Sequence, residues 1–136
     1  MLAAAVAGAE RYDEARGLFH EALAACRAAR PARDYEIAVQ LHNLAAIEQA
    51  CGQAEESERL YREALAIKQR LLGPEHPEVA LVVNNLGTLL MERGRVAEAA
   101  GCFQRALQVA TRAYPVDHPL VVRARGHLDR LGAADG

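Results

Sequence analysis

The amino-acid sequence repeats itself every 42 residues, without insertion or deletion, over three periods. The loop dipeptide His76-Pro77 returns as His118-Pro119 at this spacing. Other columns of the repeat keep one kind of side chain: Leu2, Leu44, Leu86 and Leu128; Phe19, Tyr61 and Phe103; Ala22, Ala64 and Ala106; Ile37, Val79 and Val121. A unit of this length cannot bury its apolar face alone, so the period predicts stacked units that share one continuous core.

Each period contains two runs of apolar residues at helical spacing. In the third period, Leu86, Leu89 and Leu90 belong to the first run, and Phe103 and Ala106 belong to the second. Residues three and four apart share one face of a helix, which indicates amphipathic helices rather than strands. A glycine separates the two runs, and glycine readily ends a helix. Each period is therefore expected to form a helix-turn-helix unit.

The boundaries between periods carry residues that end one helix and begin the next. Gly73 suits the C-terminal cap of a helix, and Pro77 suits the first turn of the following one, where its missing N–H is no loss. The first period departs from this pattern. It lacks the proline loop, and it has Glu10 where the later periods have Gly52 and Gly94.

These signals predict an all-α fold. The expected helices are a short one around Leu2–Ala7 and longer ones near 11–29, 34–51, 54–71, 76–93, 95–113 and 118–131. We expect a single domain over residues 1–132, followed by a tail at 133–136. Its helix-turn-helix units span about 1–33, 34–75 and 76–117, and a closing helix follows at 118–131.

Composition narrows the functional classes. The hydrophobic fraction of 51% is rich in alanine and contains no tryptophan, which suits closely packed helices. A net charge of −2 without a basic block argues against nucleic-acid binding, and no apolar run is long enough to span a membrane. The three cysteines show no paired spacing, which is typical of reduced thiols in a cytoplasmic protein. Phosphate-binding and catalytic motifs are absent from the sequence, so we expect neither an enzyme nor a cofactor.

The third period carries the residue pattern of a tetratricopeptide repeat. The pattern is Leu86-Gly87 with Leu90, then Gly94, then Ala99 with Phe103 and Ala106. The segments Tyr61–Ile67 and Leu72–Ala80 resemble the 42-residue repeats of kinesin light chains and of related bacterial proteins. The resemblance covers nearly the whole chain and implies a right-handed superhelix of about three units. By the same register, the first helix lacks about its first half and the last helix has no partner after it, so we expect either a fragment of a longer array or ends that another molecule covers.

The resemblance also implies a binding surface on the concave face, which the first helix of each unit lines. The positions that match this face and make the best contact candidates are Asn43, Asn84, Asn85, His42, Thr88, Arg123, His127 and Arg130. Asn43 and Asn85 are equivalent and are expected roughly 10 Å apart, so two carboxamides could grip the backbone of an extended peptide. The alternative is that these asparagines bind a neighbouring repeat and hold the superhelix together.

Other residues admit two interpretations. His76 and His118 each follow a carboxylate residue, but they recur one repeat apart rather than converging, so a structural role at a helix N-terminus is favoured over metal binding. Cys102 stands where Leu18 and Leu60 occur, and we expect it in the core. Arg123 and Arg130 could favour an acidic ligand or could simply form a solvated helix face.

The sequence therefore predicts a non-enzymatic interaction or adaptor module that binds a peptide or protein partner in its concave groove. Two alternatives stay open. One is a self-assembling module whose terminal helices stack on other copies as a homo-oligomer. The other is an accessory or sensor subunit that binds and positions an enzyme.

Overall fold

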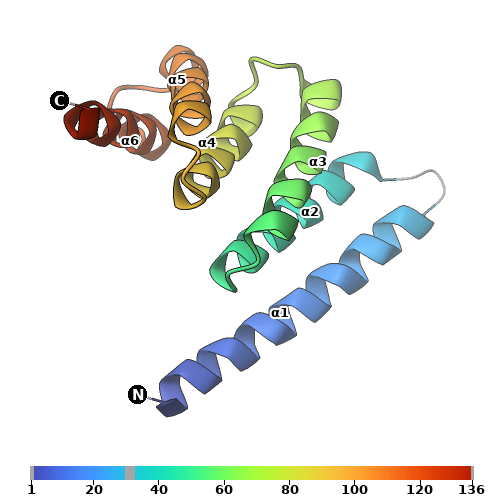
Figure 1. Cartoon of the computed structure of the whole chain (residues 1–136). Coiled ribbons are helices and arrows are strands. Elements are labelled where there is room, and N and C mark those ends of the chain that lie inside the picture. The colour runs from blue at the N-terminus through green and yellow to red at the C-terminus, as the bar shows by residue number, and fades with distance from the viewer. Residues whose placement is uncertain (1, 30–32, 136) are drawn as a thin grey trace. The chain divides into compact units, whose positions relative to one another are not determined.

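The computed structural model describes residues 2–29 and 33–135, with the backbone alone at residues 2–7, 9 and 133–135. The described part consists of six helices and no strand (Figure 1), which confirms the all-α prediction. The helices are α1 (Leu2–Ala28), α2 (Asp34–Ala50), α3 (Ala54–Leu72), α4 (Pro77–Glu92), α5 (Val96–Ala113) and α6 (Pro119–Asp135). None of these described helices is long and apolar enough to cross a bilayer.

The chain divides into two compact units. The first covers residues 1–67 and contains α1, α2 and most of α3; the second covers residues 68–136 and contains the last turn of α3 and helices α4 to α6. The boundary falls inside α3. A single domain over residues 1–132, expected from the sequence, remains a prediction.

The first helix differs from the prediction. Residues Leu2–Ala28 form one uninterrupted helix (Figure 1), so the expected short helix around Leu2–Ala7 with a break near Glu10 is wrong. The reason lies in the turn residue. The equivalent Gly52 and Gly94 both adopt a left-handed backbone with φ of +78°, a conformation that a glutamate strongly resists. In this alanine-rich segment the helix simply continues through Glu10.

The turns after α2 and α4 have the same hydrogen-bond pattern. The N–H of Gln53 donates to the carbonyl of Glu48 at 2.8 Å, and 42 residues later the N–H of Arg95 donates to the carbonyl of Leu90 at 2.9 Å. A bond of this span, with a left-handed glycine before it, satisfies carbonyls that the helix end leaves without partners. The identical turns confirm that the repeat length is a structural period.

In the α2–α3 and α4–α5 pairs, a small residue on the first helix lets the second helix approach closely. On α4, a Cβ atom placed on Gly87 would lie only 2.7 Å from Cε1 of Phe103 on α5, whose side chain is fully buried. On α2, the carbonyl of the equivalent Ala45 accepts a hydrogen bond from the Ser57 hydroxyl of α3 at 2.7 Å. The same repeat position on the first helix thus contacts the second helix in both the α4–α5 pair and the α2–α3 pair, through different partner residues.

Replacing Gly87 by alanine is expected to destabilise the fold. The added methyl group collides with the buried Phe103 ring, and overpacking of this kind costs about 1–3 kcal/mol, more than the helix propensity that alanine gains. Gly101 is the matched control, because it lies inside α5 and a Cβ there meets nothing within 4 Å. Urea denaturation should show Gly87→Ala below and Gly101→Ala at or above wild-type stability. Equal shifts would contradict the close approach.

Candidate functional site

Helix α4 presents a polar edge beside a buried stripe. Asn85 and Thr88 are partly exposed, and the Thr88 hydroxyl donates to the Asn85 carbonyl at 2.7 Å, which ties that side chain to its own helix. Asn84 is different. Only 1% of it is exposed, and its side-chain oxygen accepts no hydrogen bond from any described residue. Asn85 and Thr88 therefore lie at the surface as expected, whereas Asn84 does not.

Helix α2 places its two candidate residues at the surface of the first unit. His42 and Asn43 are both partly exposed, and they precede the buried Leu44. The His42 ring packs at a tilt against the ring of Tyr61, with the ring centroids 5.7 Å apart. The Tyr61 hydroxyl in turn donates to the side-chain oxygen of Gln49 at 2.9 Å. His42 thus packs partly against Tyr61, and the structure shows no such ring contact for Asn43.

Helix α6 carries a histidine between two arginines. Arg123 and Arg130 are exposed, and a guanidinium nitrogen of Arg130 lies 2.7 Å from Nδ1 of His127. A guanidinium can only donate, so Nδ1 of His127 is the acceptor. The His127 ring also stacks on Phe103 of α5, with centroids 4.4 Å apart and planes at 19°. This candidate contact residue therefore also holds α6 against α5.

The surroundings of His127 lower its pKa from the ordinary value. Burial against α5 is the main cause, and the positive charges of Arg130 and Arg123 add to it. All three effects disfavour the imidazolium form.

The two loop histidines have a structural role, as the sequence indicates. Nδ1 of His76 accepts a hydrogen bond from the N–H of Glu78 at 3.1 Å, and Nδ1 of His118 accepts one from the N–H of Leu120 at the same distance. Each ring caps the N-terminus of a helix whose first residue is proline. Among the described residues, His, Cys, Asp and Glu form no group of three or more that could hold a metal ion.

A charged cluster between α1 and α2 was not foreseen. The Arg16 guanidinium contacts both the nearly buried Glu48 carboxylate and Asp13, and the hydrogen bond to Glu48 raises the pKa of Arg16. Its only signal in the sequence is that Glu48 stands where the third period has Leu90. The repeat pattern predicts an apolar residue at this position.

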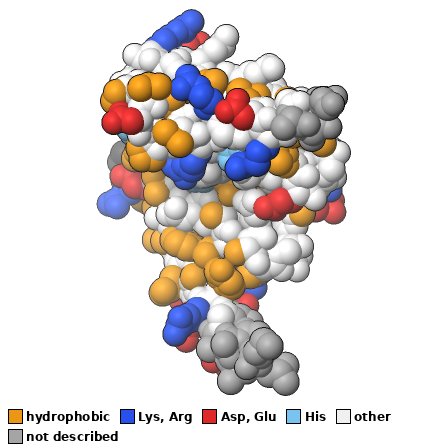
Figure 2. Space-filling view, turned by 90° about the vertical axis from the view of Figure 1, so that its left-hand side faces the viewer, with side chains coloured by type: hydrophobic (Ala, Val, Ile, Leu, Met, Phe, Trp, Pro, Cys, Tyr) orange, Lys and Arg blue, Asp and Glu red, His pale blue; other side chains and the backbone are white. Residues whose placement is uncertain are grey.

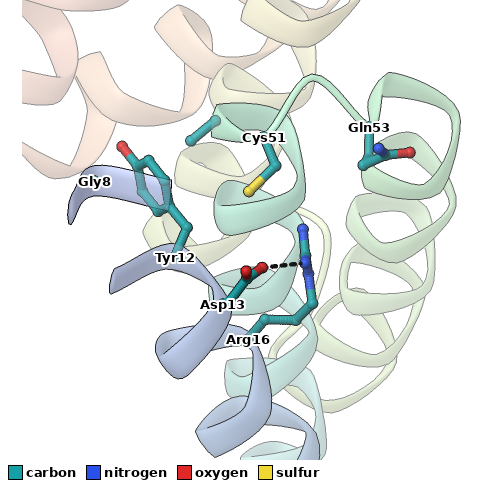
Figure 3. Close-up of a pocket in the computed structure, with 7 residues that line it drawn as sticks. Gly8, Tyr12, Asp13, Arg16, Cys51 and Gln53 are labelled. Carbon is teal, nitrogen blue, oxygen red and sulfur yellow. Dashed lines mark hydrogen bonds and ion pairs between the residues drawn. The ribbon is translucent and has the colours of Figure 1, made fainter. Parts of the chain in front are cut away.

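This cluster borders a pocket of about 540 Å³. Tyr12, Asp13 and Arg16 reach it from α1, and Cys51 and Gln53 come from the turn after α2 (Figure 3). Two carboxylates already neutralise Arg16, so the pocket offers no unbalanced positive charge to an anion.

Two further side chains differ from expectation or were missed. Cys102, expected in the core, is only partly buried, although a Cβ placed on Gly87 would lie 3.1 Å from its own Cβ. Lys68 is 4% exposed, and its Nζ lies 3.6 Å from a carboxylate oxygen of Glu78.

On the face shown in Figure 2, basic and acidic side chains are interspersed, with hydrophobic ones exposed between them.

Lowering the pH should destabilise the fold through His127. Its folded pKa lies below 6.5, so the unfolded chain binds more protons than the folded one as the pH falls past that value, and stability is lost there. We expect His127→Gln to lose less stability than wild type between about pH 8 and pH 5.5. Urea denaturation at both pH values measures this. Equal losses in the two proteins would contradict a role for His127.

Removing a histidine cap should weaken the helix that it begins. His76→Ala leaves the N–H of Glu78 without its acceptor and is expected to cost about 0.5–2 kcal/mol. His76→Asn offers a side-chain oxygen to the same N–H and should retain most of the wild-type stability. Thermal denaturation of both variants tests the cap, which would be excluded if alanine and asparagine behaved alike.

Comparison with known proteins identifies the repeat. The family model described as tetratricopeptide repeat matches residues 37–78 and 79–120, two adjacent periods that make up more than half of the chain. A search among curated proteins gives no significant match.

Solved structures share the fold. The crystal structure of BtubC (BKLC) from P. vanneervenii has a TM-score of 0.80 and 28% identity, and the match covers 93% of this chain and 51% of that one. A putative kinesin light chain from Podosopora anserina with nearly identical TPR-like repeats has a TM-score of 0.80 and 25% identity, covering 99% of this chain and 64% of that one. A crystal structure of a point variant of the same protein gives a TM-score of 0.81. The present chain thus spans between half and two thirds of these solved chains. With the helix pairs, the glycine turns and two matched periods, the chain belongs to the tetratricopeptide repeat family.

Proposed function

We propose that this chain is a non-enzymatic adaptor that binds a peptide or protein segment along the first helices of its repeats. Tetratricopeptide repeats generally mediate protein–protein interaction, which supports the class of function. The proposal adds where binding occurs and which side chains contact the ligand. Asn43 on α2 and Asn85 on α4 are its main contacts, with His42 and Thr88 beside them.

The observation that carries the proposal is the exposure of two equivalent amides. Asn43 and Asn85 occupy the same repeat position, and both keep part of their side chain at the surface, whereas the next residues, Leu44 and Leu86, are buried. A carboxamide has a donor and an acceptor, so it can pair with a peptide group irrespective of the ligand's sequence. Such a pair supports binding to a main chain, and neighbouring residues then set the specificity.

The α6 residues give the ligand a preferred charge. Arg123 and Arg130 are exposed on either side of His127 in the second unit. Paired arginines favour a carboxylate, and after burial the positive charges of these two arginines contribute to lowering the pKa of His127. We infer that a ligand reaching α6 carries an acidic residue there. Asn84 is omitted from the contacts because it is buried.

The proposal can be tested with peptides selected for binding to the purified chain from a random display library. Affinities are then compared for wild type and the Asn43→Ala/Asn85→Ala variant, after circular dichroism has confirmed that both fold. Each lost amide contact costs about 0.5–1.5 kcal/mol, so the loss of two should lower the affinity about 5- to 150-fold.

The matched control changes two exposed amides on a second helix of a repeat, Gln104→Ala/Gln108→Ala, and should bind like wild type. Should the asparagine variant bind as tightly as the control, these two residues do not contact the ligand and the proposed surface is wrong. Failure to select any specific peptide would count against peptide binding itself.

A further inference from the structure

Three arginines of helix α6 have no carboxylate partner among the residues that the structure describes. Arg27 and Arg112, on other helices, each lie 3.0 Å from a glutamate carboxylate oxygen. No described aspartate or glutamate forms such an ion pair with Arg123, Arg125 or Arg130, and all three are exposed. In a chain with a net charge of −2, α6 therefore holds positive charge that its described surroundings do not neutralise.

Two of these arginines share one side of the helix with a histidine. Arg123, His127 and Arg130 stand at positions i, i+4 and i+7, which lie on one side of a helix within two turns. We call these three residues the basic face. Asp129 follows Arg125 by four residues and so shares the side of Arg125 instead. The basic face thus has no acidic residue of α6 within it.

His127 holds one guanidinium of the basic face in place. Its Nδ1 accepts a hydrogen bond from Arg130 at 2.7 Å, and its ring stacks on the uncharged ring of Phe103. Among the described residues, only Arg130 and Arg123 act on the ring by charge. Burial and these two charges keep the pKa of His127 below its ordinary value, so the ring is mostly neutral in the free chain at neutral pH.

A bound oxyanion reverses these conditions. A carboxylate or phosphate group only accepts hydrogen bonds, and a guanidinium can pair with it through two parallel bonds. An oxyanion on Arg130 draws that donor away from Nδ1 of His127 and offsets the positive charge beside the ring. Both changes favour a proton from solvent on Nδ1. The protonated ring then donates an N–H of its own to the oxyanion.

We propose that the basic face is an oxyanion site that takes up a proton at His127 when it is occupied, so that an acidic group of the partner binds more tightly as the pH falls. The coupling is reciprocal, since an anion that raises the proton affinity of the ring must itself bind better to the protonated form. This proposal rests on the proposed function, because it describes how the ligand's acidic group is held at α6. The site recognises the charge and oxygens that carboxylates and phosphate groups share.

The test is a titration of the purified full chain, followed through the backbone amide signals by two-dimensional NMR at about pH 7.5 and about pH 6. Two probes distinguish the source of the oxyanion. N-acetylaspartate N-methylamide carries a carboxylate, and sulfate stands for a phosphate group; neither probe changes its charge over this range. At least one probe should shift signals around His127, with an affinity about three- to tenfold higher at the lower pH. The tighter probe identifies the source.

Variants of α6 separate the basic face from the overall charge, after circular dichroism has confirmed folding at both pH values. Arg130→Gln should lower the affinity about three- to tenfold. Arg125→Gln is the matched control, because it removes the same charge from another side of the helix, and it should stay within about twofold of wild type. His127→Gln should still bind at the higher pH and lose the pH dependence.

Three results would overturn the proposal. One is that neither probe shifts signals of α6 at tens of millimolar. Another is an affinity that is equal at both pH values, or a pH dependence that survives in His127→Gln. The third is an equal loss in Arg125→Gln and Arg130→Gln, because net charge alone then explains binding. The probes are small anions and the variants lie on α6, so these results are distinct from the peptide contacts of Asn43 and Asn85.

Discussion

The fold depends on the close contact between a small residue on the first helix of a repeat and the second helix. Gly87 against Phe103, and Ala45 against Ser57, bring the two backbones near enough for the aromatic side chain to be fully buried. A larger residue at either position would push the helices apart. Gly87 and Ala45 occupy the same repeat position, so the α4–α5 and α2–α3 pairs both approach closely at an equivalent residue of their first helix.

The same contact determines which side chains remain for binding. Once the small residue and its neighbouring leucines turn toward the second helix, Asn43 and Asn85 are left partly at the surface. Asn43 and Asn85 therefore belong to the proposed adaptor surface and not to the core. His127 belongs to both, since it packs on Phe103 and sits between two exposed arginines.

Repetition made most of the fold predictable, and departures from repetition were the hard part. Columns of like residues predicted the helix pairs, the glycine turns and the capping role of His76 and His118. The burial of Asn84 and the Arg16–Glu48 contact were not predictable, because a polar residue in a repeat column has no periodic signal for its partner. The continuity of α1 was missed for another reason: the missing glycine at position 10 was visible, but its effect was set by the alanine-rich flanks.

The unbroken α1 shows how little separates two topologies of the same repeat. At one position, a glycine closes a repeat within its own chain, whereas a glutamate straightens the hairpin into a rod of 27 residues, about 40 Å long. The residue at the turn position, and not only the apolar columns of the repeat, thus helps to set where a helix ends.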